Sequence, residues 1–134
     1  MQKLNVTDRF AGVAHWAGLS EEDKATIGAA ALEWMAAEAV QDRGYQEGGD
    51  LMICRERVGM AAGDACRNAI QEIFVDAVPR EALEGADGAP RIPTLLGMVC
   101  ECCGCSENDA CPEGCSWARD DLCTACTKEG RDDA

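Results

Sequence analysis

Apolar residues recur at helical spacing over two long stretches of the N-terminal half of the chain. In the first stretch, Ser20 is a typical N-cap residue, and the acidic run 21–23 lies in the first turn, where the helix dipole favours anions. Gly44 is a typical C′ residue, so we expect this helix to end there. The apolar surface of the predicted helix consists of Ile27, Ala31, Leu32, Met35, Ala36, Ala39 and Val40.

The second stretch predicts a helix from about Asp50 to Val75, with Pro79 beyond its end. Its apolar positions at helical spacing are Leu51, Cys54, Val58, Ala62, Ala65, Ala69 and Ile73. Gly59 and Gly63 are four residues apart, and two interpretations fit them. They weaken the helix, or they let another helix approach closely.

A shorter helix is predicted from Thr7 to about Ala17, with Phe10, Val13 and Ala14 facing inward. We therefore predict a mainly α protein: a helical domain over residues 1–79 followed by a small C-terminal Cys-rich metal-binding module. Residues 80–96 mix glycine, proline and charge and read as a linker, the module spans residues 97–128, and residues 129–134 read as a disordered tail.

Eight of the ten cysteines lie between Cys100 and Cys126, framed by two CxxC pairs. Cys100 and Cys103 form the first pair, and Cys123 and Cys126 form the second, which gives the spacing C-x2-C-x19-C-x2-C. Each CxxC turn places two sulfurs on one side of a tight bend, so two turns supply the four thiolates of a tetrahedral zinc site. Metal binding then replaces a hydrophobic core that so short a module cannot build.

The inner cysteines leave several alternatives open. Cys105, Cys111 and Cys115 are one ligand short of a second tetrahedral metal site, which Cys102, a bridging sulfur from the first site or an upstream residue would complete. An iron–sulfur cluster also uses thiolates and fits the CxxC spacing. Disulfides and free buried thiols are the remaining alternatives, although a reducing cytosol disfavours disulfides.

The net charge of −13 bears on the class of partner. Residues 1–79 carry 13 acidic and 7 basic side chains, and residues 80–134 carry 12 and 5, so both halves are acidic. Neither half would be attracted to a phosphate backbone, and between Cys100 and Cys126 the single base is Arg119. We therefore expect no direct nucleic-acid contact by the module, and a protein partner with a basic surface. The Ala-rich helices also suit pairing across a homodimer.

No sequence motif of catalysis is found. GxSxG, HExxH, the P-loop, GxGxxG and the zinc-deaminase pattern are all missing, and four thiolates would close the coordination shell of a zinc ion. We expect Cys54 and Cys66, 12 residues apart on one helix, to be buried small hydrophobes, and His15, the single histidine, to have no ligand role. Neither an N-terminal signal peptide nor a membrane span is predicted, so the expected location is the cytoplasm.

The cysteine region resembles a small, zinc-ribbon-like module of uncharacterised phage and prophage proteins. The resemblance covers 27 of the 134 residues, and the residues that carry it are Cys100, Cys103, Gly104, Cys105, Ala110, Cys111, Gly114, Cys115, Trp117, Asp121, Leu122, Cys123 and Cys126. Cys102 departs from the pattern, because that position is usually not cysteine. The resemblance implies a phage or mobile-element origin, and a host-cell cytoplasmic location with it.

Three functions remain at this point. The first is a non-enzymatic acidic phage-type protein that binds a host protein or nucleoprotein complex, as a nucleic-acid mimic or an inhibitor of host defence. The second is a zinc-dependent nucleic-acid-binding regulator, for which the arginines at positions 55, 57 and 67 are the available basic cluster. The third is an iron–sulfur or thiol redox protein. We expect zinc, and we expect Trp117 to cover the metal module rather than to stack on a partner.

Overall fold

The computed structural model describes residues 3–128 of the chain, and the predicted disordered tail, residues 129–134, lies outside them. The fold is mainly α with a small Cys-rich region, as predicted. The chain divides into two compact units. Residues 15–79 form one unit, and the segments before His15 and after Pro79 together form the other. One boundary therefore coincides with Pro79, whereas the first residues of the chain belong with the cysteines.

Helix α2 spans Glu21–Glu47 and begins as the sequence predicts. The Ser20 Oγ accepts a hydrogen bond of 3.0 Å from the Asp23 backbone N–H, which satisfies one of the free amides of the first turn. The predicted end at Gly44 is wrong, because Gly44 is a buried interior position where the next helix comes close. A Cβ at Gly44 would lie 3.0 Å from the Arg55 Cβ. The last helical residue is instead Glu47, and Gly48, which has a φ of 60°, is the C-cap residue.

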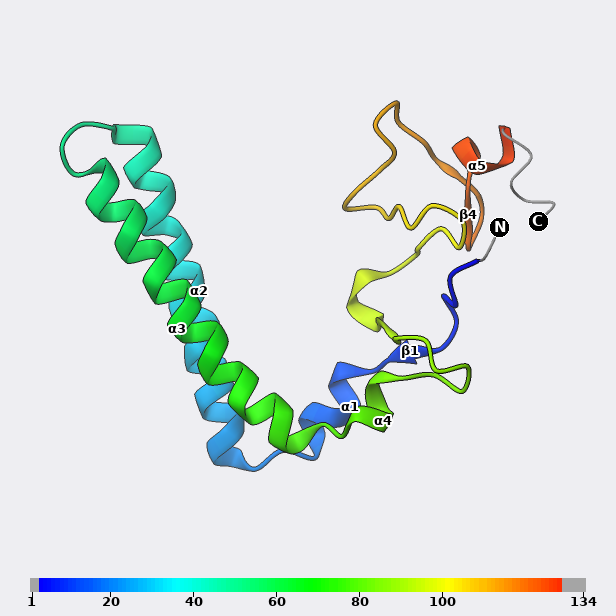
Figure 1. The fold of residues 1–134 in the computed structure, drawn as a ribbon, viewed down its shortest axis with the longest axis horizontal. Helices are drawn as coiled ribbons and strands as arrows, with labels where there is room; N and C mark the ends of the chain where they lie inside the picture. The colour runs from blue at the N-terminus through cyan, green and yellow to red at the C-terminus, as the bar shows by residue number, and fades with distance from the viewer. Residues whose placement is uncertain (1–2, 129–134) are drawn as a thin grey trace. The chain divides into compact units, whose positions relative to one another are not determined.

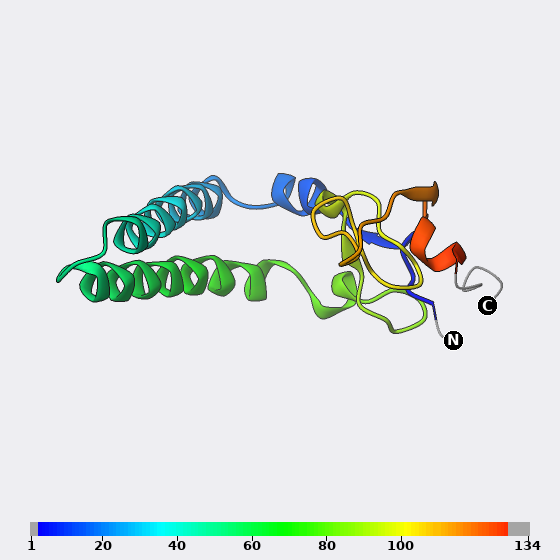
Figure 2. The same ribbon diagram turned by 90° about the horizontal axis from the view of Figure 1, so that it is seen from above.

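Helix α3 spans Met52–Ala77, close to the predicted range, and runs back along α2 (Figure 1). Figure 2 shows the same two helices from above, side by side along their length. Gly59 lies at a close approach of the two helices: a Cβ there would be 2.8 Å from the Ala37 carbonyl oxygen and 2.9 Å from the Gln41 Cβ. The glycine therefore lets the second helix approach, which is one of the two interpretations its spacing allowed.

The helix pair has a narrow interior. Its buried residues are Ala30, Ala37, Gly44 and Gly59. Large apolar side chains on the same helices are exposed, among them Leu32 at 75% and Met35 at 58%. The sequence pattern predicted an apolar surface that contains both residues, and one partner helix covers only a stripe of it.

The N-terminal segment differs from its prediction. A helix over Thr7–Ala17 is wrong at its start, because α1 spans only Gly12–Ala17. The Asn5 side-chain oxygen accepts from the backbone N–H of Thr7 and of Asp8, and this local turn competes with helix formation. The next two residues form strand β1, Arg9–Phe10. Val13, expected to face inward, is 85% exposed.

Residues 80–96, expected to be a linker, contain three short elements. These are helix α4 (Arg80–Leu83), strand β2 (Ile92–Pro93) and the 3-10 helix η1 (Thr94–Leu96). Strand β2 pairs in parallel with β1, and the Arg91 guanidinium donates to the Asp8 carboxylate at 2.9 Å. The segment thus joins the N-terminal residues to the Cys-rich region.

The Cys-rich region has little regular structure. Strands β3 (Trp117–Arg119) and β4 (Leu122–Cys123) pair antiparallel, and helix α5 (Thr124–Lys128) follows directly. Residues 3 and 4 contact this region as well, since the Leu4 N–H donates to the Glu101 carbonyl at 2.8 Å and Lys3 pairs with the Glu101 carboxylate at 2.9 Å. None of the helices described within residues 3–128 is long and apolar enough to cross a bilayer.

Candidate metal centre

The two CxxC pairs come together through different local structures. The first pair lies in a loop that Gly104 turns with a φ of 79°, and the Gly104 N–H donates to the Cys100 carbonyl at 2.9 Å. The second pair begins at the end of β4 and continues into the first turn of α5, which brings Cys126 back toward Cys123. A glycine is suited to the first loop because its φ is positive.

The sulfurs of Cys100, Cys103, Cys123 and Cys126 form one compact group. All four lie within 4.8 Å of one another. The Cys100 and Cys126 Sγ atoms are 3.7 Å apart, and so are the Cys103 and Cys123 Sγ atoms. A tetrahedron of sulfurs with a metal–sulfur distance of about 2.3 Å has edges of about 3.8 Å. The structure therefore places these four cysteines where they could hold a metal ion.

A second group of four sulfurs overlaps the first. Cys103, Cys105, Cys111 and Cys123 also lie within 4.8 Å of one another, with 3.9 Å between the Cys103 and Cys111 Sγ atoms. Cys105 and Cys111 belong to the inner set that the sequence left open, but the other two members come from the CxxC pairs. Cys115 lies next to this group, 3.8 Å from the Cys105 Sγ, and Cys102 belongs to neither group. A bridging sulfur from the first site was one of the alternatives that the sequence left open, and the structure places two sulfurs, those of Cys103 and Cys123, in both groups.

The cysteines themselves form the core of this region. Cys100, Cys123 and Cys126 are fully buried together with Leu122, and Cys105 is 7% exposed. The Trp117 side chain packs against this cluster, in line with the predicted role as a cover. A core made of so few apolar residues stabilises a fold weakly unless a metal ion joins its sulfurs.

Hydrogen bonds to sulfur favour the thiolate form at two of the CxxC positions. Burial opposes ionisation of Cys100, but backbone N–H groups directed at its sulfur, including that of Cys123 at 3.4 Å, lower its pKa. Burial opposes ionisation of Cys123 too, yet the Cys126 backbone N–H and neighbouring thiols bring its pKa to about 6. These two sulfurs are therefore prepared for a cation, which binds thiolate rather than thiol.

The pKa values of the inner thiols Cys105 and Cys111 are shifted in the opposite direction. The neighbouring Cys115 thiol, followed by burial, raises the pKa of Cys111 to about 12, and burial raises the pKa of Cys105. Bringing several sulfurs together without a cation disfavours a negative charge on all of them. A bound cation reverses this preference, so metal binding at the second group would release protons.

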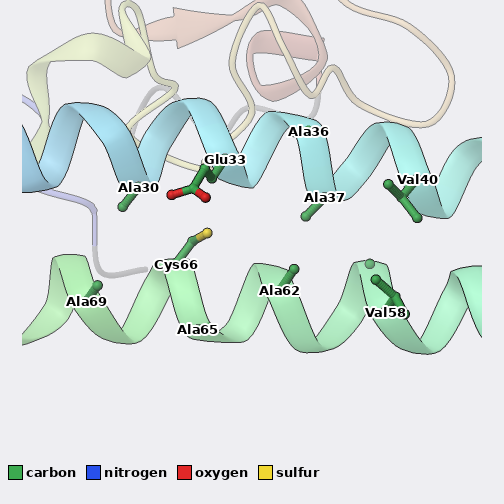
Figure 3. Close-up of a pocket in the computed structure, with 11 residues that line it drawn as sticks. Ala30, Glu33, Ala36, Ala37, Val40, Val58, Ala62, Ala65, Cys66 and Ala69 are labelled. Carbon is green, nitrogen blue, oxygen red and sulfur yellow. The ribbon is translucent and has the colours of Figure 1, made fainter.

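The remaining candidates lie away from the sulfurs. Cys54 and Cys66 are both on α3 in the other unit, and the expectation that both are buried is wrong for Cys54, whose side chain faces solvent. Cys66 is half-buried, and its side chain points toward α2 (Figure 3). His15 is half-buried in α1 and belongs to neither sulfur group. None of the ten cysteines, all of which lie within residues 3–128, forms a disulfide.

The helix pair carries a shallow groove between α2 and α3. Figure 3 shows that alanines from both helices line it, together with Glu33, Val40 and Val58. The lining holds no cluster of nucleophilic, acidic or metal-binding groups. Among the described residues, the groups of potential metal ligands are the two sulfur groups.

Comparison with known proteins returned no match. No protein-family model, no curated protein and no solved structure matches this chain.

Proposed function

We propose that this chain is a non-enzymatic, acidic interaction protein whose Cys-rich unit is held by structural zinc. The observation that carries the proposal is the group of four sulfurs, three from buried cysteines and one from the exposed Cys103, in which two pairs are separated by the edge length of a metal tetrahedron. Because cysteine supplies all four ligands, the shell is closed and leaves no position for a substrate. The metal then has a structural role.

Zinc is favoured over an iron–sulfur cluster by the packing of the sulfurs. In a cluster, the cysteines bind different iron atoms separated by inorganic sulfide, so they do not all lie on one small tetrahedron. Here all four sulfurs fall within 4.8 Å. A single ion that prefers tetrahedral thiolate coordination suits that spacing.

The proposed partner is a protein or nucleoprotein complex with a basic surface. The single base of the Cys-rich stretch, Arg119, donates to Glu101 and Asp121 at 2.9 and 2.8 Å, so its charge is already neutralised. Seven of the other basic side chains within residues 3–128 also lie within 4.0 Å of a carboxylate oxygen. They are Lys3, Lys24, Arg43, Arg55, Arg67, Arg80 and Arg91. The surplus negative charge therefore faces solvent and suits a partner that normally holds nucleic acid.

The same pairing argues against a nucleic-acid-binding regulator. Of the three arginines that the sequence offered for phosphate contact, Arg55 is bonded to Glu47, and Arg67 lies 3.8 Å from Asp64. A tetrathiolate zinc adds a formal charge of about −2. The resemblance of the Cys-rich stretch to phage modules makes a host complex, including a defence complex that the chain would inhibit, the partner we propose.

Metal analysis of the purified full chain tests the zinc centre. We expect a colourless protein with zinc by elemental analysis, and ten titratable thiols after denaturation with chelator. Cys126→Ser should lower the zinc content, whereas the matched control Cys54→Ser, an exposed cysteine of the helix pair, should not. A brown protein with iron and sulfide, or oxidised cysteines with no metal, would overturn the proposal.

Competition tests the partner. Titration of the full chain into a host nucleoprotein complex should displace the nucleic acid, and the apparent affinity should fall steeply as salt increases. A control chain of similar size and charge without the cysteine module tests whether charge alone suffices. Absence of displacement, or displacement insensitive to salt, contradicts the mimicry.

A further inference from the structure

The overlap between the two sulfur groups is the feature that the structural zinc site leaves unexplained. Cys103 and Cys123 belong to both groups, and their Sγ atoms are 3.7 Å apart, the length of one tetrahedron edge. Cys100 and Cys126 lie in the first group alone. Cys105 and Cys111 lie in the second group alone. Two tetrahedra that share an edge have this arrangement.

We propose that the cysteines form a binuclear centre, with two divalent ions bridged by the sulfurs of Cys103 and Cys123. This inference rests on the proposed zinc centre and adds a second ion to it. A thiolate sulfur has more than one lone pair, so a single sulfur can bind two ions at once. Cys100 and Cys126 complete the first ion's shell, and Cys105 and Cys111 complete the second.

Three observations favour shared sulfurs over two separate sites. The second group is completed by Cys103 and Cys123, whereas Cys102 and Cys115 lie outside it. Two separate tetrathiolate sites would need eight thiolates and carry a formal charge of about −4, but six thiolates around two dications carry about −2. The smaller charge suits an acidic stretch in which the single base is already paired. Cys105 is also a core residue, and a second ion would join it to the other core sulfurs.

Cadmium-113 NMR on the full chain distinguishes the arrangements. Cadmium replaces zinc at thiolate sites, and bridging sulfurs transmit scalar coupling between two cadmium nuclei. We expect two signals in the thiolate region, each split by the other. Two unsplit signals would indicate separate sites, and one signal a single ion; both overturn the binuclear centre and leave the structural metal standing. No thiolate-region signal would overturn both proposals.

Native mass spectrometry of zinc-loaded variants tests the ligand assignment. The wild-type chain should hold two zinc ions, and Cys111→Ser should hold one. Cys115→Ser is the matched control: this cysteine is half-buried like Cys111, lies four residues away and contacts the Cys105 sulfur, yet it should keep two ions. Cys103→Ser should lose zinc from both sites because its sulfur serves both ions. Two ions in Cys111→Ser, or one in Cys115→Ser, would contradict the assignment.

Discussion

The helix pair and the Cys-rich unit differ in what they bury. The pair α2–α3 buries alanine and glycine along a narrow stripe and leaves residues such as Leu32 exposed. The Cys-rich unit, residues 3–14 and 80–128, has a core cluster of four cysteines and Leu122, and the regular elements wholly within it are at most five residues long. Backbone hydrogen bonds repeated along two long helices stabilise the first unit, whereas the second depends on what joins its sulfurs. Similar lengths of chain therefore reach a stable fold by unlike means.

Removal of metal should produce the largest difference in stability between the two units. Treatment of the full chain with a strong chelator should abolish amide protection in the Cys-rich unit and leave the protection of α2 and α3 nearly unchanged. The reason is that structural zinc contributes about 10–16 kcal/mol in small metal-dependent domains. Hydrogen exchange read by mass spectrometry provides the measurement, with the Glu101 and Thr124 amides as reporters, since both donate across the unit to carbonyl groups at 2.7 and 2.9 Å. Equal loss of protection in both units would erase the contrast.

A pair of Gly→Ala substitutions should act in opposite directions within the helix pair. In Gly59→Ala, the new methyl group would lie 2.8 Å from a backbone oxygen of α2, and such overpacking costs about 1–3 kcal/mol. In Gly28→Ala, nothing lies within 4 Å, so the change should stabilise α2 by about 1 kcal/mol. Urea denaturation followed by the helical circular dichroism signal measures both variants. Stabilisation by both substitutions would show that Gly59 is not a point of close approach.

Loss of the helix cap should have the smallest effect. Ser20→Ala removes the acceptor for the Asp23 N–H and should destabilise the helix pair by about 1 kcal/mol, without any change in metal content. Thr26→Ala, at an exposed position inside the same helix, is the control and should be neutral or slightly stabilising. The same urea denaturation and an elemental analysis measure the two effects. A drop in metal content in Ser20→Ala would mean that the two units are coupled.

Much of the helix pair was predictable because its signals are local. The Ser20 cap and the apolar spacing identify two long helices within a few residues of their observed limits. The end at Gly44 was mispredicted because a glycine has two uses, a chain reversal and a close helix contact, and only the partner helix decides between them. The start of the first helix was mispredicted because Phe10 lies instead in β1, which pairs with residues about 80 positions further along the chain.

The cysteine group was predictable in its outer members and not in its inner ones. Two CxxC turns define a four-sulfur set from spacing alone, and the structure brings these four sulfurs together. Which sulfurs accompany Cys105 and Cys111 depends on how the loop between the turns folds back, and no local pattern encodes that path. The role of the first residues of the chain was hidden for the same reason, since Lys3 meets Glu101 only after folding.

The pairing of strand β1 with β2 means that β1 is synthesised long before the strand it pairs with. Residues 3–10 leave the ribosome before the helix pair, but the residues they bond to, among them Ile92 and Glu101, come about 80 to 100 positions later. The helix pair is complete within the intervening segment and forms from local contacts, which are the fast ones. The N-terminal segment therefore stays without these partners until Glu101 is made. The sulfurs of Cys123 and Cys126 are the last of the first group to be made, so that group is assembled only after the helix pair is complete.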